Sequence, residues 1–591
     1  MRTLLMLLLA AVLGFQCRQN SPQKADAAAT PMKDFIEQFY RDRLALNPLE
    51  ATTQGVEGYN DQLPITVSED YRRQVHEFYT RTKTALAQYN PEQLDATDRI
   101  SYDILQWECD IELAGQKFPD NYMSINQFWS LPLTLGQYGS GSGTQPFKTV
   151  TDYDNWLKRL QAFTVWTDSA IVYTRKGMNA GYVLPKSLIV KVIPQFKELL
   201  VSDPTKSLYY GPIQVMPADF PAAEKTRLTA AYTKMIAEQL TPAFQKLADF
   251  FEKEYLPKGR STSGISDVPG GRERYDHLIK YWTTTEMSAD EIFNLGQQEV
   301  ARIRTEMEKV KAQVGFKGDL KAFFDYVRSD KKFMPFQKPE EVTAWYASLE
   351  MVMKPQLNKM FDLTPKSKFE VRRTEAFREA SASAEYSQGT PDGSRPGVFY
   401  VPVPDATTYN VVGGESLFLH EAIPGHHYQI SLQQENTALP SFRRFLWYGA
   451  YGEGWALYTE SLGRELGLYT DPYQYFGMLS SEMHRAIRLV VDVGLHTKGW
   501  TREQAIQFSK DNEADSEESI IAEIERYMAI PGQALSYKIG QLKILELRSK
   551  AEKALGDKFD LKEFHNQVLD AGCLPLKVLE AKIDRWIAGK R

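Results

Sequence analysis

Apolar side chains recur at helical spacing along most of the chain. Between residues 228 and 251 they fall three and four positions apart, which places them on one face of a helix. A second apolar stripe follows Ser288, and Ser288 with Glu291 forms the capping-box pattern that begins a helix. The stretches 31–113 and 559–591 show the same spacing. These patterns predict a mainly α-helical protein.

The longest stretch without helical spacing is 381–414. Within it, Val398–Val401 is β-branched and aromatic, and the prolines that follow end the pattern, as is typical of a short strand. The length of 591 residues alone would suggest about four domains. Because no repeat, charge block or clean linker divides the chain, we expect one large helical domain, residues 25–591, with a small sheet.

The first residues have the features of a targeting signal. After a short basic start, residues 4–15 are apolar, a length of about 12 that suits a secretory signal and is too short to span a bilayer. Cys17 lies where a bacterial lipoprotein carries its lipid, although the three residues before it depart from the usual small-residue pattern. We expect residues 1–17 to direct export to the periplasm or cell envelope. Lipid anchoring through Cys17 and simple cleavage within 10–14 are the two alternatives.

Composition excludes several classes of protein. With 43% hydrophobic and 25% charged residues, the chain is not intrinsically disordered, and 3 cysteines do not make a disulfide scaffold. The formal net charge of −6 gives no overall basic field, so we expect no nucleic-acid partner. Of the 8 histidines, five lie between 420 and 496, which indicates one site.

The pair His420-Glu421, followed by two more histidines, has the chemistry of a zinc hydrolase. Such enzymes use two imidazoles to hold one metal ion and a glutamate beside the first imidazole to take a proton from water. The usual spacing of four residues is replaced here by six, to His426, or seven, to His427. We therefore expect the intervening Pro-Gly pair to kink or bulge the helix.

Among these side chains we assign His420 and His426 as ligands, because removal of the Pro-Gly pair restores the four-residue spacing. His427 is the alternative ligand, and otherwise a substrate-binding residue. Glu421 is the expected general base.

A third ligand is expected from a later acidic pair. Glu453 follows His426 by 27 residues, and Glu460 lies seven residues further, on the same helix face. We assign Glu453 as the third ligand of one Zn²⁺ ion and Glu460 as the carboxylate that orients an imidazole. The alternative is a solvated acidic stripe.

Polar residues recur further along the chain, where Arg485, Arg488, Asp492 and His496 are three and four positions apart. They form either an ion-paired network between helices or part of a substrate site. In the second case His496 stabilises the oxyanion and Arg488 binds a substrate carboxylate. Both interpretations stay open.

A second Pro-Gly pair separates Tyr527 from Tyr537. A tyrosine hydroxyl can donate a hydrogen bond to an oxyanion, although aromatic packing would also account for either residue. We favour Tyr537 for the oxyanion and place Tyr527 among the substrate-binding residues.

At the segments 420–429, 453–460 and 531–538 the chain resembles domain-of-unknown-function family 885. Residues 181–185 and the helix after Ser288 also resemble it, so the resemblance covers nearly the whole mature chain. That family is similar to the gluzincin metallopeptidases, which include the angiotensin-converting enzyme, thimet oligopeptidase and thermostable carboxypeptidase groups. The resemblance implies a large helical shell with a deep cleft and a small β-sheet next to the metal-binding helix. In thimet-like enzymes the ligand glutamate begins an eight-residue segment that ends in a second glutamate.

The sequence therefore predicts an exported zinc-dependent peptidase that cleaves short peptides, with Glu421 as the base. Two other functions stay open. One is a metal-dependent hydrolase of a non-peptide amide or ester. The other is a non-catalytic protein that binds peptides or oligosaccharides.

Overall fold

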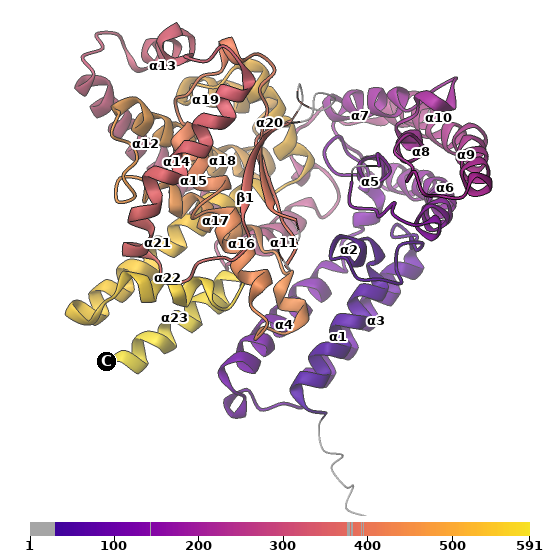
Figure 1. Cartoon of the computed structure of the whole chain (residues 1–591), viewed down its shortest axis with the longest axis horizontal. Helices are drawn as coiled ribbons and strands as arrows, with labels where there is room; N and C mark the ends of the chain where they lie inside the picture. The colour runs from indigo at the N-terminus through magenta and orange to yellow at the C-terminus, as the bar shows by residue number, and fades with distance from the viewer. Residues whose placement is uncertain (1–29, 142, 375–378, 380–381, 392, 394) are drawn as a thin grey trace, which may run out of the picture.

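The computed structural model describes residues 30–591 apart from 142, 375–378, 380–381, 392 and 394. The expected signal peptide and Cys17 lie outside the described residues. In the described part the protein is mainly helical with one small mixed sheet, as the sequence predicts (Figure 1). None of the helices in this part combines the length and apolar character needed to cross a membrane.

The buried apolar side chains of the described residues form two cores. One core draws on residues between Leu63 and Tyr255 and belongs to the smaller lobe, at the right of Figure 1. The helices of that lobe are α5 (Leu131–Tyr138), α6 (Val150–Asn179), α7 (Lys186–Glu198), α8 (Gly211–Gln214), α9 (Ala222–Met235) and α10 (Thr241–Phe250).

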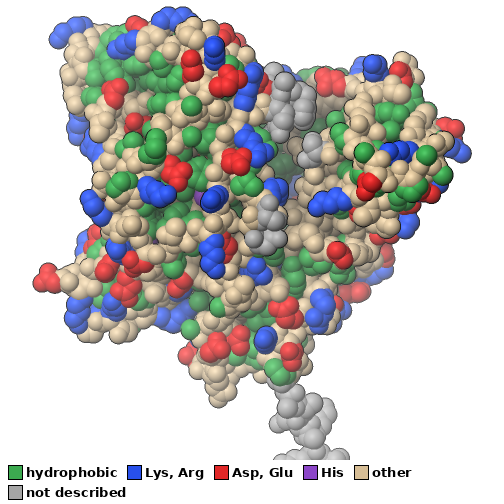
Figure 2. Space-filling view, in the orientation of Figure 1, with side chains coloured by type: hydrophobic (Ala, Val, Ile, Leu, Met, Phe, Trp, Pro, Cys, Tyr) green, Lys and Arg blue, Asp and Glu red, His purple; other side chains and the backbone are tan. Residues whose placement is uncertain are grey.

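The other core lies in the larger lobe and also takes side chains from the N-terminal helices. Those N-terminal helices are α1 (Met32–Leu46), α2 (Pro48–Thr53), α3 (Glu69–Leu86) and α4 (Ala96–Gly115). The larger lobe itself contains α11 (Gly271–Thr283), α12 (Ala289–Gln313), α13 (Leu320–Ser329), α14 (Pro339–Met360), α15 (Gly414–Glu421), α16 (His426–Glu435), α17 (Gly449–Glu460), α18 (Pro472–Thr497), α19 (Arg502–Asn512), α20 (Glu517–Ala529), α21 (Ser536–Leu555), α22 (Leu561–Leu569) and α23 (Leu576–Lys590). Figure 2 shows that the surface is hollowed between the two lobes and that side chains of both charges are interspersed over this face.

Two local predictions are confirmed. The Ser288 hydroxyl accepts a hydrogen bond from the Glu291 N–H, and the Glu291 carboxylate accepts one from the Ser288 N–H, so the capping box begins α12. The predicted strand is β3 (Gly397–Val401), at the centre of the sheet. It pairs in parallel with β1 (Phe369–Arg373) and antiparallel with β2 (Glu385–Ser387).

Helices α17 and α21 pack with their backbones almost in contact. A Cβ atom on Gly540 would lie 1.8 Å from the carbonyl oxygen of Ala450, and one on Gly454 would lie 2.5 Å from the carbonyl carbon of Gly540. Only glycine permits this approach, since a side chain on either helix would meet backbone atoms that cannot move aside. The contact fixes α17, which carries Glu453, against the body of the larger lobe.

We expect Gly540→Ala to destabilise the protein by about 1–3 kcal/mol, because the added methyl group forces α17 and α21 apart. Gly589→Ala is the matched control, since no atom outside its own helix lies within 4 Å of the added Cβ. Thermal unfolding followed by circular dichroism compares the two variants. A Gly540→Ala protein that melts at the same temperature as Gly589→Ala would contradict the close packing.

Candidate metal centre

The chain turns between α15 and α16, over residues 422–425. Pro424, which follows a cis peptide bond, has no N–H to continue α15. A Cβ atom on Gly425 would lie 2.0 Å from the carbonyl oxygen of His420, so the turn requires glycine. The prediction of a kink within one helix is wrong, because α15 ends at Glu421 and a separate helix begins at His426. The outcome is that His426 lies beside His420.

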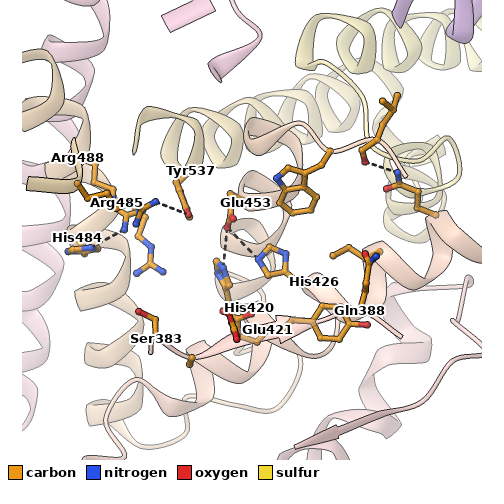
Figure 3. A pocket seen from close by; sticks show the side chains of 18 of the residues that line it. Ser383, Gln388, His420, Glu421, His426, Glu453, His484, Arg485, Arg488 and Tyr537 are labelled. Atoms are coloured by element: carbon orange, nitrogen blue, oxygen red, sulfur yellow. Dashed lines mark hydrogen bonds and ion pairs between the residues drawn. The ribbon is translucent and has the colours of Figure 1, made fainter. Parts of the chain in front are cut away.

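Three side chains from three helices converge in Figure 3: His420 from α15, His426 from α16 and Glu453 from α17. The Nε2 atoms of both imidazoles lie 3.4 Å from the same atom, Oε2 of Glu453. A charge-assisted N–H···O hydrogen bond is shorter, about 2.7–2.9 Å. Two ligands of a tetrahedral zinc ion, each about 2.1 Å from the metal, lie about 3.4 Å apart. The observed separations therefore fit a shared metal ion better than direct hydrogen bonds.

Glu421 is a second carboxylate at the same place. Among the described residues, His420, Glu421 and His426 form a group whose ligand atoms all lie within 4.8 Å of one another. The Glu421 side chain is buried and lines the cavity at this site. Of the two carboxylates, Glu453 fits the third ligand position better, because one of its oxygens is equidistant from both imidazoles.

Glu460 orients the ring of His420. Its Oε1 lies 2.8 Å from His420 Nδ1, and its Oε2 accepts a hydrogen bond from the Ser416 hydroxyl at 2.5 Å. An N–H at Nδ1 leaves the lone pair at Nε2 directed towards Glu453. The Nδ1 atom of His426 is buried and has no hydrogen-bond partner among the described residues, and its ring packs beside the indole of Trp447.

The pKa values of these imidazoles and carboxylates depend on their burial and on the opposite charges beside them. Burial opposes a charge on His420, but hydrogen bonds to Glu453 and Glu460 outweigh it and raise the pKa of His420 to about 10. Burial would raise the pKa of Glu453, yet His426 and His420 hold it well below its usual value. Burial raises the pKa of Glu421, which the two imidazoles partly offset. Without a metal, His420 therefore carries a proton at neutral pH.

A cavity of about 620 Å³ borders these side chains. It receives residues from the segment around β2, from α15 to α18, and from α20 and α21. Figure 3 shows Arg485, Arg488 and His484 on one side of His420, and Gln388 on the other. A volume of this size is typical of a site for a small ligand or a short peptide.

Arg488 and Tyr537 line this cavity together. The Arg488 guanidinium lies over the Tyr537 ring, 4.5 Å from its centroid. The Tyr537 hydroxyl accepts a long hydrogen bond of 3.5 Å from Arg526 Nη2. Both predicted residues therefore lie where a ligand in the cavity can reach them.

His496 does not reach the cavity, which corrects its assignment to the oxyanion. Its Nδ1 accepts a hydrogen bond from the Ile265 N–H at 2.9 Å, and its Nε2 donates one to the Tyr527 carbonyl at 3.0 Å. Burial lowers the pKa of His496 to about 3, so the ring is neutral and has no free N–H. Its role in the structure is to join three segments of the larger lobe.

His427 does not line the cavity and forms no hydrogen bond or ion pair with Glu453 in the described part of the chain, which corrects its assignment as a ligand or substrate-binding residue. Its Nδ1 hydrogen-bonds to the Tyr386 hydroxyl at 3.0 Å and lies 3.3 Å from the Ser431 hydroxyl. The ring packs against Phe369 in β1, and burial lowers the pKa of His427 to about 4. His427 therefore holds Tyr386, which does line the cavity.

Tyr527 is also held behind the cavity wall, so it is corrected from a substrate contact to a support. Its hydroxyl donates to Glu523 at 2.8 Å and accepts from Arg488 Nε at 3.1 Å. Tyr527 is not among the residues that line the cavity. It fixes the plane of the Arg488 guanidinium.

His484, Glu513 and Asp515 form a second group whose ligand atoms lie within 4.8 Å of one another. Burial opposes a charge on His484, but Glu513, at 2.6 Å, outweighs it and raises the pKa of His484 to about 9. Arg488 Nη2 lies 3.2 Å from His484 Nε2. A guanidinium so close disfavours a metal ion, and the group acts as an ion-paired support for the cavity wall.

Sequence reasoning gave no individual role to several cavity residues. Arg485 lies on the predicted polar ridge, three residues before Arg488, and the ridge spacing was a sufficient signal for it. Arg526 adjoins Tyr527 in the second Pro-Gly segment. Tyr386 had no sequence signal, because its strand has three residues and no apolar alternation.

The fold resembles solved structures of bacterial proteins. A protein from Colwellia psychrerythraea, described as a "putative lipoprotein", is 28% identical with a TM-score of 0.86, covering 95% of this chain and 99% of the other. A protein from Shewanella oneidensis, described as a "putative lipoprotein of unknown function", is 19% identical with a TM-score of 0.74, covering 94% and 99%. No curated protein sequence matches this chain.

The family comparison agrees with the motifs and with the fold. The sequence profile described as "Bacterial protein of unknown function (DUF885)" matches residues 48–583. The match includes every residue of the candidate metal group and of the cavity. The chain therefore belongs to the DUF885 family.

Proposed function

We propose that this protein is an exported zinc-dependent peptidase that acts on short peptides. The observation that carries the proposal is the equal separation of 3.4 Å between Glu453 Oε2 and the Nε2 atoms of His420 and His426. Two imidazoles and one carboxylate, with a second carboxylate beside them, are the donor set of a catalytic zinc site. The cavity next to the group supplies room for a substrate.

When bound, a zinc ion supplies a Lewis acid that polarises the scissile carbonyl and makes water more acidic. Glu421 accepts a proton from the attacking water and delivers it to the leaving amine. Its burial favours this exchange, since a raised pKa brings the carboxyl closer to neutral pH. The Tyr537 hydroxyl, which lines the cavity, donates a hydrogen bond to the oxyanion.

Export is the second part of the proposal. The Colwellia psychrerythraea protein is described as a "putative lipoprotein", which supports a lipid anchor at Cys17 in this chain. We accordingly place the enzyme in the bacterial periplasm or cell envelope. Short peptides that reach this compartment are its substrates, and no nucleic acid takes part.

The choice of metal ligands is testable by substitution. We expect the wild-type protein to hold about one zinc ion per chain after zinc addition and dialysis. His426→Ala loses most of this zinc, because it removes one imidazole from Glu453. His427→Ala retains it, because that ring faces Tyr386 instead. The measurement is metal content by mass spectrometry. Less than about 0.1 equivalent in the wild-type protein would reject the metal site.

The role of Glu421 is tested by turnover. We expect Glu421→Gln to lower peptide cleavage about 10²–10⁴-fold with unchanged zinc content, because the amide cannot accept the water proton. Glu465→Gln, an exposed change on the same lobe, is the control with wild-type activity. Mass spectrometry of a tripeptide mixture measures cleavage, and equal turnover by Glu421→Gln would remove it as the base.

The same assay separates the proposal from the two other functions. Cleavage of esters alone would assign a non-peptide substrate. Binding without any turnover would assign a non-catalytic protein.

A further inference from the structure

Three consecutive apolar side chains line the cavity next to the candidate metal ligands. They are Phe445, Leu446 and Trp447, from the segment that leads into α17, and we call them the apolar wall. The ring of Trp447 lies 5.7 Å from the ring of His426, which is the imidazole nearer to Gln388 in Figure 3. The apolar wall therefore borders the candidate metal site at His426. The hydrolytic step described above does not use it.

Trp447 is the exposed member of the apolar wall. It is 46% exposed, whereas Trp156, Trp166 and Trp455 are at most 2% exposed. Proteins normally bury most of a large aromatic side chain, and an indole left open in a cavity is typical of a binding surface. The exposed part of Trp447 therefore offers apolar area that a ligand can cover.

The indole is seated on the helix that carries a candidate metal ligand. A Cβ atom on Gly452 would lie 2.2 Å from Cη2 of Trp447, so the six-membered ring lies directly against the backbone of α17. Gly452 immediately precedes Glu453. The indole thus contacts one ligand imidazole and the residue beside the ligand carboxylate. A side chain that packs on the indole must belong to a residue close to the scissile bond.

Hydrogen bonds from neighbouring segments fix the backbone of the apolar wall. Gln433 Nε2 donates to the carbonyls of Arg443 and Leu446, at 2.8 and 2.9 Å. The Tyr448 N–H donates to Cys573 Sγ at 3.1 Å, and the Cys573 N–H donates to Gln433 Oε1 at 3.2 Å. Polar groups behind the wall are therefore bonded within the protein. A surface that is already ordered binds a ligand with a smaller loss of entropy.

We propose that the apolar wall is a specificity pocket for an aromatic side chain of the substrate, at a residue that directly flanks the scissile bond. Trp447 is its specificity-determining residue. This inference rests on the proposed peptidase function. An aromatic side chain is preferred because ring pairs add stacked or edge contacts to the burial of apolar area. Its position follows from the contacts of the indole with His426 and Gly452.

The test compares peptides that differ in one side chain. The probes are tetra-alanine and its derivatives with one phenylalanine, or one glutamine, at each position in turn. Binding to zinc-loaded Glu421→Gln protein is measured by calorimetry, so that no turnover is needed. We expect phenylalanine at one position to strengthen binding at least about tenfold over tetra-alanine, because its ring is removed from water. Glutamine is long but polar and should give no such gain.

Two results of this comparison would overturn the proposal. One is glutamine that strengthens binding as much as phenylalanine at the same position. The other is equal binding, or no binding, of all the peptides.

Variants made in the Glu421→Gln protein assign the preference to Trp447. Trp447→Ala should reduce the phenylalanine-to-alanine ratio to about threefold or less, and Trp447→Phe, which keeps an aromatic ring, should retain a higher ratio than Trp447→Ala. Trp129→Ala is the matched control, since Trp129 is 53% exposed and is not among the residues that line the cavity. It should keep the full ratio. A full ratio in Trp447→Ala would overturn the proposal.

Wild-type turnover tests the position of the pocket without any variant. In the phenylalanine peptide that is cleaved fastest, mass spectrometry of the products should place the cut at a bond formed by the phenylalanine residue itself. A cut at a more distant bond would overturn the proposal.

The same turnover measurement distinguishes this inference from the proposed function. Glu421-dependent cleavage of all the peptides at equal rates would keep the peptidase and reject the specificity pocket. A zinc-loaded protein that prefers phenylalanine peptides through Trp447 but cleaves none of them would keep the aromatic pocket and reject the peptidase.

Discussion

The site depends on one carboxylate oxygen placed between two imidazole rings. Oε2 of Glu453 lies 3.4 Å from Nε2 of both His420 and His426, and the Glu453 side chain is only 16% exposed. A carboxylate in such surroundings is stable only with positive charge beside it. A proton on His420 provides that charge, and its pKa of about 10 shows how strongly the carboxylates favour it. A divalent cation would occupy the same position and displace the proton. The charges are therefore arranged for a cation in either state.

The backbone makes this arrangement possible through glycines at two places. Gly425 allows the start of α16 to approach the last carbonyls of α15, which brings His426 to His420. Gly540 allows α21 to contact α17, which carries Glu453. The indole N–H of Trp455 in α17 donates to the carbonyl of Pro424 at 2.8 Å, and this bond ties the two places together. Because the ligands come from three helices, their separation depends on these backbone contacts more than on rotamers of the side chains.

The sequence was sufficient to predict features that depend on residues close together in the chain or on residue type alone. Helical spacing gave the mainly helical fold, and the capping box at Ser288 depends on residues three positions apart. The group of His420, His426 and Glu453 could be proposed because few residue types bind zinc. The form of the turn at Pro424 could not, since a helix that bends and a helix that ends both satisfy a Pro-Gly pair, and the choice depends on packing against α17.

Residues whose roles depend on long-range contacts were the ones assigned wrongly. His496 and Arg488 share a face of α18, and the ridge spacing treats them alike. His496 bonds to the backbones of Ile265 and Tyr527, from distant segments, whereas Arg488 reaches the cavity. Which end of a polar ridge faces a cavity is set by the elements that cover it, and these lie far away in the sequence.

The cavity is lined by charges of both signs, and their arrangement is itself a constraint on any ligand. Glu421 and Glu453 lie with the imidazoles at the centre of Figure 3, and Arg485 and Arg488 lie to one side of them. Glu523 partly neutralises Arg488 and Arg526, and the pKa of Glu523 is held far below its usual value by Arg488 in spite of burial. Without that carboxylate, the guanidinium groups would repel one another and lose their fixed orientation. Because a cation already lies between Glu453 and the two imidazoles in either state, a ligand fits the arginine side best with a negative or polar group.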